Sequence, residues 1–170
     1  MYRKNVCVVI FNEDLNFLAC QRIHEDKFQF VQGGVEEGDA DIIRAAYREV
    51  HEEVGLFSED LRLIGEIMPP SGDPHEFRYI LHEGANLRHF GYVGQQQRLF
   101  LFYTPSSTIQ RVRLVPPKGS VAKQEFSHVE WLPIDEIIER CPKEKQHIFV
   151  AVSKVAIPMA KAFLKTRSSI

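Results

Sequence analysis

The sequence has few cysteines, no low-complexity tract and no strong excess of either charge. Its three cysteines, Cys7, Cys20 and Cys141, are odd in number and show no C-x-x-C spacing, which argues against a disulfide framework and against a zinc site. The net charge of −2 argues against general nucleic-acid affinity, while leaving room for a local basic pocket.

Long apolar runs are also missing. We find no stretch of membrane-spanning length and no signal-peptide pattern at the N-terminus. We therefore expect an intracellular protein without a membrane partner. The cytoplasm is the first expectation for its location, and an organelle is the alternative. The sequence leaves the oligomeric state open.

The composition is that of an ordinary globular protein, with 44% hydrophobic and 26% charged residues. No linker or repeat divides the chain, so we expect one domain over residues 1–170. Apolar runs bounded by turn residues predict strands at residues 6–11, 17–20, 28–32, 61–68, 77–81, 98–103 and 129–132. Helices are expected at residues 39–54, at a short stretch opened by residues 133–135, and at residues 143–156, where Pro158 ends or kinks the last one. The pattern predicts a mixed sheet with helices on its faces, an α/β or α+β sandwich.

The chain is organised around residues 33–56, GGVEEGDADIIRAAYREVHEEVGL. The helix expected here carries an apolar stripe at spacings of three and four: Ile43, Ala46, Val50 and Val54. Glycines flank the helix on both sides: Gly33, Gly34 and Gly38 before it and Gly55 after it. A strand, a tight glycine loop, a helix and a capping glycine are therefore expected in succession.

Three carboxylates share another face of this helix, because Glu49, Glu52 and Glu53 are three and four residues apart. Like charges at these spacings repel by roughly a few tenths of a kcal/mol per pair on an exposed helix. A solvated acidic face is one interpretation. The other is a site for a hard divalent cation, which binds carboxylates together with substrate phosphate. The cofactor we expect is Mg²⁺ or Mn²⁺.

At these residues the sequence resembles the Nudix hydrolases. The family motif has a glycine, five residues, a glutamate, seven residues, and then Arg-Glu-apolar-any-Glu-Glu-any-Gly-apolar; residues 48–56, REVHEEVGL, match this second half at every specified position. The first half departs, since counting from Gly33 puts Asp39 at the glutamate position, nine residues before Arg48 where the motif has eight. Counting from Gly34 restores the spacing but puts Ala40 where the motif has glutamate. We expect the extra residue in the turn at residues 38–40, with Asp39 as the helix N-cap and the register from Arg48 onward intact.

The resemblance reaches over roughly residues 2–133 to one branch of the family, the bacterial RNA pyrophosphohydrolases and plant-type diadenosine tetraphosphate hydrolases. It is carried by YRKNV at residues 2–6, FVQGG at 30–34, GQQQR at 94–98, and EF followed by a tryptophan at 125–131. Phe28 and Val31 are departures, because the branch favours tryptophan and proline there. The resemblance implies an α/β/α sandwich with a mixed sheet.

The candidate site residues follow from the motif and the resemblance. The metal ligands would be the Gly33 carbonyl and the carboxylates of Glu49, Glu52, Glu53 and Glu125. The candidate catalytic residues are Glu52, Glu125 and Arg48, with either glutamate as the base. The candidate substrate-binding residues are Arg3, Arg22, Phe28, Tyr79 and Gln97. Arginine suits phosphate oxygens and an aromatic ring suits a nucleobase, although both also occur as strand-end ion pairs or in cores.

These features predict a metal-dependent hydrolase that cleaves a phosphoanhydride bond in a nucleotide. A dinucleoside polyphosphate such as diadenosine tetraphosphate is expected first, because Phe28, Tyr79, Phe90 and Tyr92 offer an aromatic clamp and basic residues are few. The 5′ end of triphosphorylated RNA is the alternative substrate. A hypothesis of another class is a degenerate Nudix domain that binds nucleotide or a protein without turnover, as the altered first half of the motif suggests.

Overall fold

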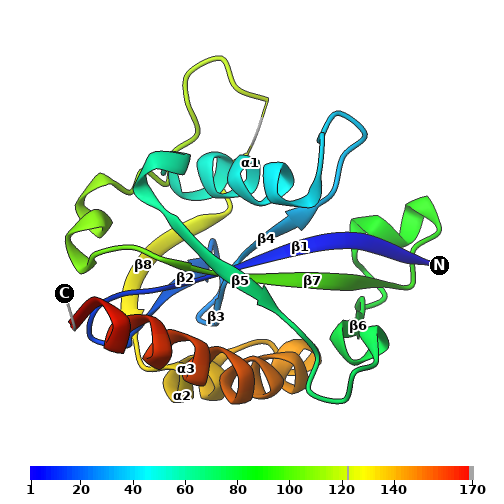
Figure 1. The fold of residues 1–170 in the computed structure, drawn as a ribbon. Helices are drawn as coiled ribbons and strands as arrows, with labels where there is room; N and C mark the ends of the chain where they lie inside the picture. Colours follow the sequence, from blue (N-terminus) through cyan, green and yellow to red (C-terminus); the bar gives the residue numbers. More distant parts are fainter. Residues whose placement is uncertain (122, 169–170) are drawn as a thin grey trace.

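The computed structural model describes residues 1–121 and 123–168, and its centre is one mixed β-sheet with helices on both faces (Figure 1). The strands are β1 (Tyr2–Phe11), β2 (Phe17–Arg22), β3 (Phe28–Gln29), β4 (Val31–Gly34), β5 (Arg62–Ile67), β6 (Arg78–Ile80), β7 (Gly94–Tyr103) and β8 (Phe126–Leu132). The helices are α1 (Ile42–Val54), α2 (Ile134–Arg140) and α3 (Gln146–Ser168). Short 3-10 helices lie at Ser58–Asp60, Pro74–Phe77, Asn86–Phe90, Ser106–Arg111 and Lys143–Lys145. The expected fold class is confirmed.

The parallel pair β1 and β7 forms the middle of the sheet. The strand order is β3-β2-β1-β7-β5, with β4 paired to β1, β6 to β7 and β8 to β2, all antiparallel. Both central strands have long buried runs, which explains their near-continuous apolar sequences. Successive side chains alternate between faces, so Val6, Val8 and Ile10 belong to the core under α1, whereas Cys7 and Val9 belong to the core under α3.

The strand expected at residues 28–32 is two strands. The chain changes partners at Phe30, so that β3 pairs with β2 and β4 pairs with β1. In the second pairing Gly33 lies opposite Val6 and Gly34 lies opposite Asn5. The glycine pair is therefore fixed beside the central strand before the chain enters the loop to α1.

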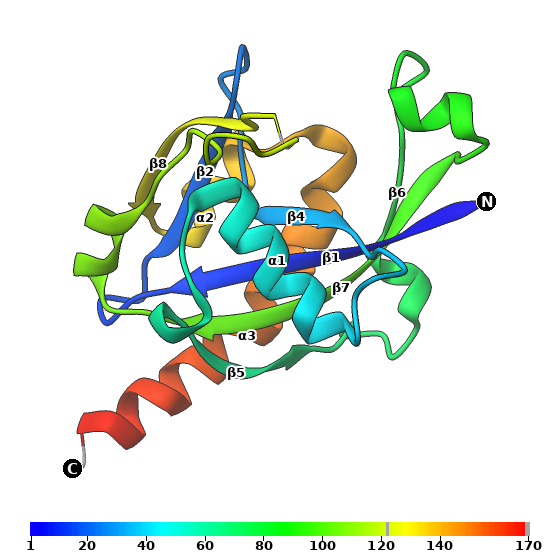
Figure 2. The same ribbon diagram turned by 90° about the horizontal axis from the view of Figure 1, so that it is seen from above.

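Helix α1 lies across one face of the sheet (Figure 2). Ala46, Val50 and Val54 are buried as the stripe predicts, whereas Ile43 is only half-buried. The small side chains allow the helix to pack closely on the sheet, where it contacts β4 and β1. The carboxylates on the adjoining face are consequently directed toward the glycine pair.

The first turn of α1 corrects one expectation. The N-cap is Asp41 and not Asp39: the Asp41 carboxylate accepts a hydrogen bond of 2.8 Å from the Arg44 backbone N–H. The helix therefore begins at Ile42, three residues after the expected start. At the other end Gly55 is left-handed, with φ of 73°, and its N–H closes the last turn.

Helices α2 and α3 cover the opposite face (Figure 1). Ile148 and Val152 are fully buried and Val155 is partly buried, as expected. The expected end near residue 156 is wrong, because α3 continues through the exposed Pro158 to Ser168. Proline cannot donate a backbone hydrogen bond there. The later turns are held by packing instead, since the Phe163 ring lies 4.9 Å from the ring of Tyr103.

One stretch also corrects the expectation about membranes. Lys143–Arg167 is long and apolar enough to cross a membrane, by length and composition alone. The core helix of a globular protein meets the same criteria, and 33% of its most apolar part is buried inside the fold. Ile148, Val152 and Ala156 on its inner face pack against the sheet. We therefore assign the apolar character of α3 to its role in covering this face.

Candidate active site

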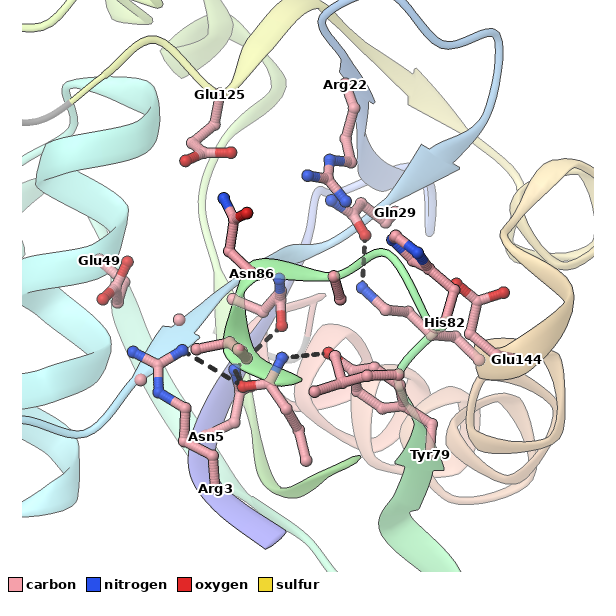
Figure 3. A pocket seen from close by; sticks show the side chains of 18 of the residues that line it. Arg3, Asn5, Arg22, Gln29, Glu49, Tyr79, His82, Asn86, Glu125 and Glu144 are labelled. Carbon is pink, nitrogen blue, oxygen red and sulfur yellow. Dashed lines mark hydrogen bonds between the residues drawn. The ribbon is translucent and has the colours of Figure 1, made fainter. Parts of the chain in front are cut away.

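A cavity of about 610 Å³ is bordered by α1, β4, the segment after β6 and the short 3-10 helix Lys143–Lys145 that precedes α3 (Figure 3). Most of the expected site residues line it: Arg3, Arg22, Gly33, Glu49, Glu52, Glu53, Tyr79 and Glu125. In the view of Figure 3, Glu49 and Glu125 lie on one side, and Arg22, Gln29 and Glu144 lie on the other. We call the side that holds Glu49 and Glu125 the acidic side; Arg3 also lies on it, whereas Arg22 lies on the opposite side together with Glu144.

Glu49 and Glu53 form the buried part of the acidic side, with exposed fractions of only 8% and 7%. Burial raises the pKa of Glu49 to about 7, against the opposing effect of the neighbouring Arg48. Burial also raises the pKa of Glu53 well above its usual value, and the charges of Glu49 and Glu125 add to this shift. The Gln32 N–H donates to Glu53 Oε1 at 3.2 Å, which compensates only part of the cost. Two adjacent buried carboxylates of this kind require a nearby cation to be ionised together.

The glycine pair is required by the two side chains that approach it. A Cβ atom at Gly33 would lie 2.0 Å from Glu49 Cδ, and one at Gly34 would lie 1.9 Å from Arg3 Nη2. Neither distance is compatible with a side chain unless its neighbour moves. Gly33 therefore admits a carboxylate to the cavity wall, and Gly34 admits a guanidinium beside it.

The remaining two expected ligands are more exposed. Glu52 is half-buried on α1, and Glu125 is exposed immediately before β8, where its backbone carbonyl accepts a hydrogen bond of 3.0 Å from Ile23. Among residues 1–121 and 123–168, no three Asp, Glu, His or Cys side chains are already grouped as ligands of one ion. Glu49 is instead paired with Arg48 at 2.8 Å. The donor set nevertheless fits a divalent cation, because it offers carboxylate oxygens with uncompensated buried charge.

Arg48 lies behind the acidic side and does not line the cavity. Its guanidinium donates two hydrogen bonds of 2.9 Å to Asp39 and one of 2.9 Å to the Gly34 carbonyl. The hydrogen bonds from Arg48 lower the pKa of Asp39. Asp39 thus gives the motif arginine a carboxylate partner from a position one residue before that of the motif glutamate. Because Glu49 and Glu52 line the cavity, the expected register of α1 is confirmed, and Arg48 acts by positioning the loop and these carboxylates.

A buried polar network underlies the middle of the cavity. The Asn5 amide donates to Gln95 Oε1 at 2.9 Å and to Gln32 Oε1 at 3.0 Å, and it accepts from Gln97 at 3.0 Å. Gln95 in turn donates to the Tyr79 hydroxyl. Every one of these side chains comes from a strand, so the network fixes polar groups on rigid elements beneath the cavity.

Four basic side chains line the cavity: Arg3, Arg22, Lys123 and Lys145. Arg3 donates to Gln95 Oε1 at 3.4 Å, and Arg22 has a long contact of 3.8 Å with Glu25. Cations and carboxylates in one cavity are the combination that a metal-bound phosphate chain requires, because the chain carries negative charge along its whole length.

Some expected substrate contacts do not reach the cavity. Phe28 is 1% exposed and packs in the core, and Gln97 is a buried member of the polar network that does not line the cavity. Of the four aromatic residues expected to clamp a base, Tyr79 alone belongs to the cavity lining. Phe90 is 76% exposed outside the lining, and Tyr92 packs against the core. The aromatic clamp expected from the sequence is therefore absent from the described lining.

Sequence reasoning also missed several lining residues, namely Asn5, Gln29, Gln95 and Lys145. A signal existed for Asn5 and Gln95, because polar residues that interrupt or begin apolar strands are expensive to bury without a role. Lys145 gave no such signal. It lies within the charged run Pro142-Lys143-Glu144-Lys145, which has the composition of a solvated surface.

Comparison with known proteins identifies the class. Residues 1–152 match the family model described as the NUDIX domain, and the chain belongs to this family. The RNA pyrophosphohydrolases of Psychrobacter sp. (strain PRwf-1) and Halorhodospira halophila are 30% and 33% identical to it over 141 residues, which is 81% of this chain and 76% and 72% of theirs. The structure of the E. coli dihydroneopterin triphosphate pyrophosphohydrolase superposes with a TM-score of 0.61 at 23% identity, over 93% of this chain and 99% of that one. The protein is therefore a Nudix pyrophosphohydrolase. Enzymes of the Nudix family generally use divalent metal ions.

Proposed function

We propose that this enzyme hydrolyses a phosphoanhydride bond in the phosphate chain of a 5′-nucleotide, with Mg²⁺ or Mn²⁺ bound by Glu49, Glu52, Glu53, Glu125 and the Gly33 carbonyl. The observation that carries the proposal is the cavity with buried carboxylates on one side and four basic side chains in its lining. Carboxylates alone would repel a phosphate chain. Arg48 compensates part of the charge of Glu49 at 2.8 Å, whereas none of the ion pairs found among the described residues includes Glu53.

Each group has a role in this reaction. A bound divalent cation neutralises phosphate charge and makes water a better nucleophile at neutral pH. The water oxygen attacks phosphorus, the bond from phosphorus to the bridging oxygen breaks, and the departing phosphate group keeps the electron pair. The proton goes to a carboxylate of the cavity, Glu52 or Glu125, which are the more exposed of the four. Arg3 stabilises charge on the phosphate chain from the position that Gly34 leaves open.

We propose the 5′ end of triphosphorylated RNA as the first substrate. Support comes from the names of the two relatives and from the four basic side chains in the cavity lining. The preference for a dinucleoside polyphosphate rested on an aromatic clamp, and Tyr79 is the single member of that clamp in the lining. Dinucleoside polyphosphates are the second candidate, because Leu81, Ala85 and Leu87 give the cavity an apolar wall suited to a further base.

The test compares a short triphosphorylated RNA with diadenosine tetraphosphate, side by side, at matched salt and with Mg²⁺ or Mn²⁺. We expect both to be hydrolysed, neither in the presence of chelator, with the higher kcat/KM for RNA. The RNA reaction should also lose kcat/KM more steeply as salt is raised, because several phosphates are contacted. Preference for diadenosine tetraphosphate would make the second candidate the primary one. If neither is hydrolysed but nucleotide still binds, the domain is a degenerate binding module.

A further inference from the structure

Lys145 is a buried cation in the cavity wall. Only 4% of it is exposed, yet it belongs to the cavity lining. Lysine is rarely buried to this extent without an acidic partner. Within the described part of the chain, no carboxylate lies in ion-pair distance of its amine; the pairs found there join other residues. The ammonium is therefore desolvated without the compensation that buried charges usually have.

The immediate contacts of Lys145 are neutral. Its Nζ donates a hydrogen bond of 2.7 Å to Gln29 Oε1 and lies 5.0 Å from the centre of the Tyr79 ring. An ammonium has three donors, so the Gln29 bond leaves further hydrogen-bonding capacity toward the cavity. Burial and the charge of Arg22 lower the pKa of Lys145 to about 8, and the charges of Glu144 and Glu53 oppose this shift only in part.

Two cations consequently act on the same side of one cavity. Arg22 and Lys145 repel each other, and the ion pair that Arg22 makes within the described residues, with Glu25, is long at 3.8 Å. An anion held between them would offset both the repulsion and the desolvation of the lysine. In Figure 3, Arg22 and Gln29, the hydrogen-bond partner of Lys145, lie across the cavity from Glu49 and Glu125. A phosphate that reached this side would be separated from the phosphorus that is attacked near the carboxylates.

We propose that Lys145 is a specificity-determining residue that binds a phosphate of the substrate outside the bond that is cleaved. The proposal rests on the proposed function for the identity of the substrate. In RNA this phosphate is the phosphodiester between the first two nucleotides. In a dinucleoside polyphosphate it belongs to the part of the phosphate chain next to the second nucleoside. Both supply the same chemistry, a non-bridging oxygen with negative charge.

The experiment uses substrates that differ by this phosphate. One arm compares a triphosphorylated dinucleotide with the corresponding nucleoside triphosphate, and the other compares diadenosine tetraphosphate with ATP. The variant is Lys145→Met, which keeps the length of the side chain and removes its charge. Lys143→Met is the matched control, because Lys143 is exposed two residues away and does not line the cavity.

Loss of one charge-assisted contact should lower kcat/KM about 10- to 100-fold for the longer substrate of the relevant arm. The shorter substrate should change less than about twofold, and Lys143→Met should resemble the wild type on both. The arm that responds identifies the source of the phosphate. Equal losses on the long and short substrates, or no loss on either, would overturn the proposal.

Binding provides a readout that does not depend on turnover. In chelator, the Kd of a 5′-mononucleotide divided by the Kd of the 5′-monophosphorylated dinucleotide should be larger for wild type than for Lys145→Met. If the wild type hydrolyses nothing, the proposed function fails while this ratio still decides the role of Lys145. Thermal unfolding checks that each variant is folded. Should Lys145→Met not fold, Lys145→Gln keeps a donor for Gln29 without the charge, and the same ratios apply to it.

Discussion

Asp39 occupies the place of the motif glutamate one residue early, and removal of its carboxylate tests that assignment. The carboxylate accepts two hydrogen bonds of 2.9 Å from Arg48 and one of 2.8 Å from the Glu36 backbone N–H. Shielded hydrogen bonds to charged groups contribute about 1.5–3 kcal/mol each. This loop lies near solvent, which screens the charges, and Arg48 keeps its bonds to Gly34 and Glu49. We therefore expect Asp39→Ala to lower the free energy of unfolding by about 1–2 kcal/mol.

The loss should appear in both stability and catalysis. A change of this size lowers Tm by about 3–6 °C in a domain of this length. Turnover should fall about tenfold, since Arg48 would hold the Gly34 carbonyl and Glu49 less firmly. The double variant Asp39→Ala with Ala40→Glu puts a carboxylate at the spacing of the family motif, and it should recover at least half of each loss.

A helix-cap variant separates this anchor from general destabilisation. Asp41→Ala removes the N-cap of α1 and should cost about 1 kcal/mol. Ala40→Glu should not recover that loss, because the missing interaction is at the helix end and not at Arg48. The reasoning is refuted if Asp39→Ala has the Tm and turnover of the wild type. It is equally refuted if Ala40→Glu restores the Asp41 variant as well as the Asp39 variant.

Three further outcomes follow from the carboxylates and the glycine pair. Gly33→Ala should lower kcat about 100-fold, because its Cβ would meet Glu49 Cδ at 2.0 Å. Gly34→Ala should mainly raise KM, because its Cβ would displace the flexible end of Arg3. Gly38→Ala is the kinetic control, since its Cβ would meet nothing within 4 Å. Glu53→Gln should have a higher Tm than the wild type in chelator, and it should lack the gain in Tm that metal gives the wild type. If its Tm in chelator is lower than that of the wild type, the cost assigned to this buried charge is wrong. The pKa of Glu49 is raised from 4.5 to about 7, so the folded state binds the proton more tightly than the unfolded state. The free energy of unfolding of the metal-free protein should therefore fall as the pH rises from 4.5 to about 7. Unfolding curves of Glu49→Gln over the same pH range should show a smaller fall.

The sequence predicted those parts of the site that local periodicity determines. The spacing of Glu49, Glu52 and Glu53 places them on one helix face in any α-helix, and all three line the cavity. The central strands were equally predictable, because burial on both faces demands continuous apolar runs. Arg3 and Arg22 were found through resemblance, and both line the cavity.

The remaining features depend on contacts between distant segments. Asp39 and Asp41 are both good N-cap residues, and only the position of Arg48 decides which of them caps α1. An aromatic residue in a short strand can face a cavity or the core, and Phe28 faces the core. Lys145 lies far from the motif in sequence and meets Gln29 only after α3 has packed against the sheet. Such pairings are set by tertiary packing, which composition and periodicity do not encode locally.

The most direct test of the account is the metal dependence of turnover in Glu53→Gln. This change keeps the shape of a buried side chain and removes its capacity to bind a cation as a carboxylate. With triphosphorylated RNA or diadenosine tetraphosphate, whichever the wild type prefers, kcat should fall by at least about 100-fold across a titration of Mg²⁺ and Mn²⁺. Near-normal turnover by the folded variant at the metal concentration that serves the wild type would contradict the assignment of this cavity as the metal-dependent active site.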